Sequence, residues 1–398
     1  MRTARGLGQT GTAPRPARPP RRVRLGAWHR GVLFLMRRAY FGSVRVSGAP
    51  EPARVRPRIV LASHRNGALD GAVVQAAFPW AQFLVSMQLM RGPLRLLVTG
   101  IPVIRQRDVE RYRMDRSTVT DPVSASIDHI VAGGDLVIFP EGTSEWGHAP
   151  GTYHRGAAMI WCRLQQAGVE VDVIPLGLMY SAPERFCSLA DMWRGSALEL
   201  PGPGDDEDSE WERRVHEAMM RNLDAVSVHC PDPETFDRVQ RRATERARAG
   251  ESFAAAFLEE QDQARRRARD SGPEPEHEPA RRGLGAGAHS WPRRIGLALH
   301  WLLAPVLLAA WSAGRAADAR NTVSFFRVLG GTSGVLVWVP LLAAGLGGAA
   351  ATGAGPAAST IVCAGLACAV LGGVILRARR WQPDTAPLTD RTADPPHR

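Results

Sequence analysis

Short apolar runs alternate with helical patterns over the middle of the chain. The runs have the length and bounding residues of buried strands and lie at 44–46, 59–62, 83–85, 136–139 and 171–178. Helical patterns cover 122–132 and 155–167, and the first is framed by Asp121, Pro122 and the pair Gly133-Gly134. Strands that alternate with helices predict an α/β fold with functional residues at strand ends.

The segments before this region have a different composition. Residues 1–24 are rich in Arg and Pro and contain no acid, which predicts a disordered basic tail. Residues 25–41 have the apolar spacing of an amphipathic helix, with Arg30 and Arg37 on another face. Two interpretations stay open for this helix. It lies in a membrane interface with its arginines toward anionic headgroups, or it packs on the neighbouring domain.

Charged helical patterns follow the α/β region. They cover 210–226 and 234–269, with most arginines predicted on a solvated face. Pro, Glu and Gly then crowd 271–289, which predicts a linker. We therefore assign 236–290 to a charged helix followed by a linker.

The C-terminal region, 291–380, is predicted to be a membrane region. Residues 328–376 contain no charged side chain, and a break at 352–356 divides them into two spans. A bilayer core requires about 20 apolar residues per helix, so these spans predict a transmembrane hairpin. The uncharged run 295–314 contains His300 and Pro305 and is expected to be interfacial or re-entrant.

Arginines flank the predicted hairpin. Arg327 precedes it, and Arg377, Arg379 and Arg380 follow it. By the positive-inside rule, both ends and the α/β domain are expected on the cytoplasmic face. Residues 381–398 are expected to form a polar tail.

The overall charge narrows the classes of partner. The chain has 398 residues and a formal net charge of +11, which suits nucleic acid, an anionic membrane surface or a phosphorylated substrate. No interleaving of Arg with aromatic residues appears, which argues against nucleic acid. The five Cys show no C-x-x-C spacing, so neither a zinc site nor a disulfide framework is predicted.

The first candidate for chemistry is His64 with Asp70, directly after the apolar run 59–62. A histidine beside a carboxylate suits general-base activation of a hydroxyl. On a continuous helix the two residues would lie about 120° apart, so a helix alone would not bring them together. Gly67 permits a turn. We therefore predict a non-helical turn around Asn66 and Gly67, with a helix beginning only at Leu69 or Asp70.

Two more strand ends carry polar groups. Arg105 closes a Gly-x-Pro-x-x-Arg sequence after apolar residues, and Glu141-Gly142 follows the run 136–139. Together the three sites offer a base, a cation and a carboxylate beside flexible backbone. This set suits a substrate with a hydroxyl to deprotonate and a phosphate to hold. With a membrane-bound C-terminus, it indicates lipid chemistry.

The motifs resemble those of the glycerolipid acyltransferase family that makes lysophosphatidic and phosphatidic acid. Residues 64–70, 100–105, 139–143 and 173–176 resemble its four blocks in order and spacing. Two departures occur, since five residues instead of four separate His64 from Asp70, and Ser144 stands where the commonest third block has Arg. Both features resemble a subgroup that includes fungal-type glycerol-3-phosphate and dihydroxyacetone-phosphate acyltransferases.

The resemblance implies a fold, a reaction and a set of site residues. It implies a glycerol-3-phosphate acyltransferase-like mixed sheet over 42–235, which transfers an acyl group from acyl-CoA or acyl carrier protein to the hydroxyl of glycerol 3-phosphate or lysophosphatidate. His64 would be the base and Asp70 its orienting carboxylate, without a cofactor or a metal. The substrate-binding residues implied are Arg105, Glu141, Gly142, Thr143 and Asn66.

Three alternatives stay open from the sequence. The acceptor could be a different lipid, because the sequence does not define the acceptor pocket. The domain could be a non-catalytic membrane module that binds lipid. His64 could instead activate water in a hydrolase of thioesters or phospholipids.

Overall fold

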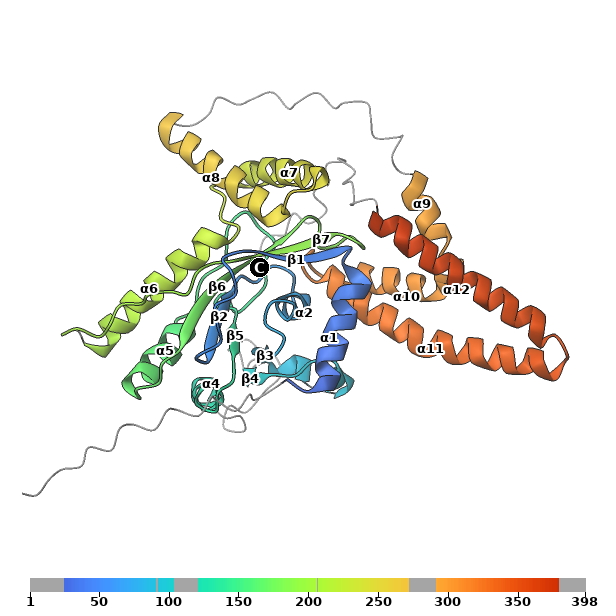
Figure 1. Cartoon of the computed structure of the whole chain (residues 1–398), viewed down its shortest axis with the longest axis horizontal. Coiled ribbons are helices and arrows are strands. Elements are labelled where there is room, and N and C mark those ends of the chain that lie inside the picture. Colours follow the sequence, from blue (N-terminus) through green and yellow to red (C-terminus); the bar gives the residue numbers. More distant parts are fainter. Residues whose placement is uncertain (1–24, 91, 104–120, 206, 272–290, 379–398) are drawn as a thin grey trace, which may run out of the picture.

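The computed structural model describes residues 25–90, 92–103, 121–205, 207–271 and 291–378. The basic tail predicted at 1–24, most of the linker in 271–289 and the polar tail at 381–398 lie outside the described residues. Arg105 lies outside them as well. The fold is a mixed α/β sheet flanked by helices, followed by a separate group of apolar helices (Figure 1).

The sheet has seven strands in the order β1-β7-β6-β2-β5-β3-β4. In chain order the strands are β1 (Ser43–Gly48), β2 (Arg58–Ala62), β3 (Gln82–Ser86), β4 (Ile101–Val103), β5 (Leu136–Ile138), β6 (Asp172–Tyr180) and β7 (Leu189–Arg194). Every pairing is parallel except that between β6 and β7. The α/β fold predicted from the alternating pattern is therefore confirmed, while β7 was not predicted.

Strand β2 lies at the centre of the sheet and decides where the site forms. It pairs with β5 on one side, Leu61 opposite Ile138, and with β6 on the other, Ala62 opposite Leu176. Parallel strands end at the same edge of a sheet, and the loops that follow β2 and β5 therefore emerge side by side. His64 and Glu141 lie on those two loops.

Helices cover both faces of the sheet because side chains along β2 alternate between them. Val60 and Ala62 pack with α1 (Ala27–Tyr40) and α2 (Leu69–Val74). Ile59 and Leu61 pack instead with the helices on the opposite face (Figure 1). Those helices are α4 (Pro122–Val131), α5 (Gly156–Gln166) and α6 (Asp208–Val226). As predicted, Asp121 caps α4, accepting a hydrogen bond from the Ser124 backbone N–H at 3.0 Å.

The charged segment 234–269 forms two helices, so the prediction of one helix was wrong. Helix α7 (Pro233–Ala249) ends at Gly250, whose φ of 114° lies in the left-handed region, and α8 (Phe253–Ser271) begins shortly afterwards. The two helices pack together through Phe236 and Phe257. Their shared core also contains Met179 of β6, which attaches the pair to the edge of the sheet near β7.

Helix α1 turns Arg30 and Arg37 toward the domain and leaves apolar residues exposed. Met36 and Tyr40 are buried against the domain. The Arg30 guanidinium lies 4.1 Å from the centre of the Trp80 ring, and Arg37 Nη1 donates to Gln75 Oε1 at 2.9 Å. On the outer face Trp28 and Leu35 are 64% and 65% exposed. Helix α1 therefore packs on the domain, and Arg30 and Arg37 contact the protein, while the membrane-interface position expected for the exposed face stays a prediction.

The C-terminal region contains α9 (Trp291–Ala298), a 3-10 turn (Trp301–Leu303), α10 (Ala304–Arg315), α11 (Val323–Ala351) and α12 (Gly355–Ala378). The uncharged run 295–314 is thus divided among three short elements. Helices α11 and α12 match the two predicted spans and are long and apolar enough to cross a membrane, by length and composition. Their most apolar stretches lie almost entirely outside the protein core.

The close approach at Gly177 provides a test of the central sheet. A Cβ at this position would lie 1.7 Å from the Val226 carbonyl oxygen. We expect Gly177→Ala to lower the free energy of unfolding by more than about 2 kcal/mol, because backbone must move to admit the methyl group. Chemical denaturation in detergent measures the change. Gly202→Ala is the control, since nothing lies within 4 Å of its Cβ position; equal effects of the two changes would contradict the packing.

Candidate active site

His64 and Asp70 meet across a turn that is not helical. The Asp70 N–H donates to Gly67 O at 3.1 Å, and helix α2 begins at Leu69. Gly67 has a φ of 55°, in the left-handed region that favours glycine. The turn brings His64 Nδ1 to 2.8 Å from Asp70 Oδ2. The turn geometry predicted from the six-residue spacing is therefore confirmed.

The Asp70 carboxylate is fully buried and collects four hydrogen bonds. Oδ2 accepts from the backbone N–H groups of Arg65 at 2.7 Å and Asn66 at 2.8 Å, in addition to His64 Nδ1. Oδ1 accepts from the Tyr180 hydroxyl. A buried carboxylate with this many donors is held in one orientation. It therefore fixes the proton of His64 on Nδ1 and leaves Nε2 to act as a base.

Tyr180 belongs to the site but was not found from the sequence. It ends β6, and its hydroxyl is brought to Asp70 by the pairing of β6 with β2. Burial, followed by the nearby Asp70 charge, raises the pKa of Tyr180 well above its ordinary value. The phenol thus remains a hydrogen-bond donor throughout the physiological range. In the sequence it is only the last residue of an apolar run, so no local pattern marks it.

Arg65 is a second residue that the sequence reading missed. Its side chain is buried behind His64, where Nη2 donates to Gly147 O at 2.7 Å. The guanidinium also lies 4.8 Å from the centre of the Trp146 ring. Burial lowers the pKa of Arg65, and the neighbouring Glu141 and Asp70 charges oppose that change. Arg65 therefore supplies a cation close to two buried carboxylates.

Glu141 and Asn66 hold loops in this structure and lie behind the cavity wall. Glu141 Oε1 accepts a hydrogen bond from the His64 backbone N–H at 2.8 Å, which joins the loops after β2 and β5. Both side chains are buried. Neither is among the described residues that line the cavity, and the expectation that both bind substrate stays a prediction.

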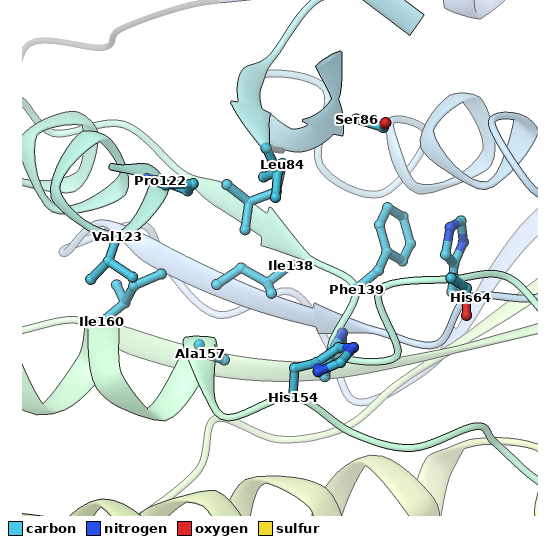
Figure 2. Close-up of a pocket in the computed structure, with 15 residues that line it drawn as sticks. His64, Leu84, Ser86, Pro122, Val123, Ile138, Phe139, His154, Ala157 and Ile160 are labelled. Carbon is cyan, nitrogen blue, oxygen red and sulfur yellow. The ribbon is translucent and has the colours of Figure 1, made fainter. Parts of the chain in front are cut away.

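An apolar cavity of about 540 Å³ opens beside His64. Of the predicted substrate-binding residues, Gly142 and Thr143 line it. The Phe139 ring stacks on His64 with 4.4 Å between ring centres, and Val123 and Ile160 lie at the end away from His64 (Figure 2). The remaining lining is Leu84, Ser86, Val103, Pro122, Ile138, Pro140, His154, Gly156 and Ala157. A largely hydrocarbon wall beside the imidazole rings of His64 and His154 suits a substrate with a long apolar part.

Metal ligands do not gather at this site. Within the described ranges, no group of three or more His, Cys, Asp and Glu side chains could hold a metal ion. The three free cysteines of the α/β part, Cys162, Cys187 and Cys230, are all buried.

Comparison with solved structures gives a likeness over part of the chain. No protein-family model matches the chain, and no curated protein matches it in sequence. The crystal structure of the 1-acyl-sn-glycerophosphate (LPA) acyltransferase PlsC from Thermotoga maritima is similar, with 17% sequence identity and a TM-score of 0.33. The likeness covers 49% of this chain and 78% of that chain. An overlap this limited adds nothing to what the side chains of the site indicate.

The buried Glu141 carboxyl makes the stability of this site depend on pH. Burial raises the pKa of Glu141 above its ordinary value, although the hydrogen bond from the His64 N–H opposes the change. A raised pKa in the folded state stabilises the protein below the ordinary pKa, and this contribution is lost as pH rises through the raised pKa. We therefore expect Glu141→Gln, which does not titrate, to gain stability relative to the natural protein as pH rises from 4 to 8.

Unfolding midpoints across this pH range provide the measurement. Glu145→Gln is the matched control, since Glu145 is an exposed carboxylate on the same loop. Curves for the natural protein and Glu141→Gln that stay parallel across the range would contradict the assignment.

Proposed function

We propose that this protein is a membrane-associated acyltransferase that moves a fatty acyl group from a thioester to the hydroxyl of a phosphorylated glycerolipid acceptor. The observation that carries the proposal is the hydrogen bond of 2.8 Å between His64 Nδ1 and the buried Asp70 carboxylate, at the wall of an apolar cavity. A base positioned beside hydrocarbon suits acyl transfer to a hydroxyl.

The proposed reaction needs only one base. His64 Nε2 removes the proton of the acceptor hydroxyl as its oxygen attacks the thioester carbonyl carbon. The C–O bond forms, the C–S bond breaks, and the imidazolium returns its proton to the leaving thiolate. Asp70 stabilises the transient charge on His64 and keeps the ring in position, with Tyr180 and the Arg65 and Asn66 amides holding Asp70 in turn.

The two parts of the substrate would use different parts of the site. The acyl chain fits the cavity between Phe139 and Ile160, which is lined mainly by hydrocarbon. Arg105 would hold the acceptor phosphate by charge-assisted hydrogen bonds, an assignment that rests on the sequence motif. Glycerol 3-phosphate and lysophosphatidate are the proposed acceptors, and acyl-CoA or acyl carrier protein is the proposed donor.

Two features support a membrane location. Helices α11 and α12 have the length and composition of membrane spans. Helix α1 turns an exposed apolar face outward, with Trp28 and Leu35 on it, while Arg30 and Arg37 contact the domain. Such a face suits contact with lipid. The arginines on either side of the hairpin support a cytoplasmic position for the catalytic domain.

Replacement of His64 tests the reaction directly. We expect His64→Ala to reduce acyl transfer by about 100- to 10,000-fold, the contribution of a general base. Purified full-length protein in lipid would be given labelled acyl-CoA or acyl carrier protein with glycerol 3-phosphate or lysophosphatidate. His216→Ala is the control, because His216 lies half-buried on α6 and does not line the cavity.

Three outcomes would reject the proposal. If no donor and acceptor pair gives product, the domain is not an acyltransferase for these acceptors. If His64→Ala matches the natural protein, the base is elsewhere. If free fatty acid forms at the same rate without acceptor, the protein is a hydrolase.

The far end of the cavity offers a test of acyl-chain binding. Val123 lines that end, and we expect Val123→Phe to lower kcat/KM for long acyl thioesters by about tenfold or more relative to short ones, because the ring occupies the chain's terminal space. Val131→Phe is the control, since Val131 lies on the same helix and is exposed. If kcat/KM falls equally for long and short acyl thioesters, the acyl chain does not extend to Val123.

A further inference from the structure

The junction between the C-terminal helices and the α/β domain lies directly against the candidate active site. Ser324, in the first turn of α11, is fully buried, and its Oγ donates to Asn66 Oδ1. Asn321 is 7% exposed, and its Nδ2 donates to the carbonyl oxygen and, at 3.0 Å, to the hydroxyl of Ser144. Asn66 lies in the His64–Asp70 turn, and Ser144 follows Gly142 and Thr143 of the cavity wall. Two residues from the C-terminal region thus contact both loops of the site.

The fit between the junction and the turn is close. A Cβ at Gly67 would lie 3.2 Å from the Asn321 carbonyl oxygen, so the turn and the junction approach through backbone. The Ser144 hydroxyl accepts a hydrogen bond from Asn321 Nδ2. Ser144 therefore joins the loop after β5 to the C-terminal segment.

Contacts outside the site anchor the same segment. Arg320 forms an ion pair with Glu184, with 3.0 Å between Nε and Oε2, and Arg327 donates to the Glu184 carbonyl oxygen. The Arg320 guanidinium also lies 5.0 Å from the centre of the Trp146 ring, and Trp146 contacts the buried Arg65. Residues 320–327 are therefore held at both ends, with Asn321 and Ser324 between the anchors.

We infer that Asn321 and Ser324 are positioning residues of the active site, through which the seating of the C-terminal helices controls the His64–Asp70 geometry. A single residue, Asn66, links Ser324 to Asp70. Its backbone N–H donates to Asp70 Oδ2, and its side-chain Oδ1 accepts from Ser324 Oγ. Loss of the Ser324 hydroxyl leaves a buried amide oxygen without its donor, and the turn then loses the constraint on one of Asp70's four hydrogen bonds.

The catalytic part of this inference rests on the proposed acyltransferase function. Since neither residue lines the cavity, their loss is expected to lower kcat and leave the KM for the acyl donor nearly unchanged. A role limited to overall stability would lower the amount of folded protein, so kcat is calculated per folded, active protein, and such a role would leave that kcat unchanged.

The test compares Ser324→Ala and Asn321→Asp with Ser333→Ala in full-length protein reconstituted in lipid. Asn321→Asp keeps the shape of the side chain and removes the Nδ2 donor. Ser333 lies on the same helix and donates only to Leu329 O within it, which makes Ser333→Ala a matched control. We expect kcat to fall by about tenfold in the first two variants, with donor KM within about twofold of the natural value and no change in the control.

Amide hydrogen exchange over residues 64–71 gives a second readout that does not require turnover. Faster exchange in Ser324→Ala than in Ser333→Ala is expected, because the Arg65 and Asn66 amides are then less firmly bonded to Asp70. Absence of turnover in the natural protein would reject the acyltransferase proposal, while exchange would still decide whether the junction holds the turn. If amide exchange over residues 64–71 and kcat in both variants equal those of the natural protein, the inference is wrong.

Discussion

The buried Asp70 carboxylate is the constraint on which the site depends. A charge removed from water is tolerated only where donors replace its hydration, and Asp70 has four of them. Three come from the turn that contains it and one from Tyr180 on a distant strand. The turn, the end of β6 and the imidazole must therefore be in place together. This requirement converts a flexible Gly67-containing turn into a defined geometry for His64.

The parallel order of the sheet brings the remaining groups to the same place. Because β2 lies between β5 and β6, the loops after β2 and β5 and the last residue of β6 meet at one edge. Glu141 joins the first two by accepting from the His64 N–H, and Tyr180 joins the third. The apolar cavity opens at this edge, between the sheet and helices α4 and α5 (Figure 2). The polar groups that orient the His64 ring thus lie on its Nδ1 side, and the apolar cavity wall lies beside the ring.

The N-terminal and C-terminal helices join this site to exposed apolar surface. Helix α1 packs on α2 immediately after the His64–Asp70 turn, and its outer face is apolar. The start of α11 bonds to the same turn through Ser324. Helices α1 and α11, which carry exposed apolar residues, therefore both lie close to the turn.

The sequence by itself determined the local features of this protein. Apolar runs located most of the strands, Asp121 and Pro122 located the start of α4, and the His64–Asp70 spacing with Gly67 required a turn before the helix. These features depend on neighbouring residues, whose periodicity and backbone preferences are visible in a single chain. The break at Gly250 was missed although glycine marks it, because the charged helical pattern continues on both sides.

Only the tertiary structure decided which distant residues complete the site. Tyr180 and Ser324 carry no local signal, and they reach the turn through strand pairing and through helix docking. The role of Arg65 could not be predicted for the same reason, since its burial against Trp146 depends on the loop after β5. Likewise, contacts with Trp80 and Gln75 turn the side chains of Arg30 and Arg37 toward the domain. Contacts between residues far apart in sequence follow from the packing of whole elements, which no local pattern encodes.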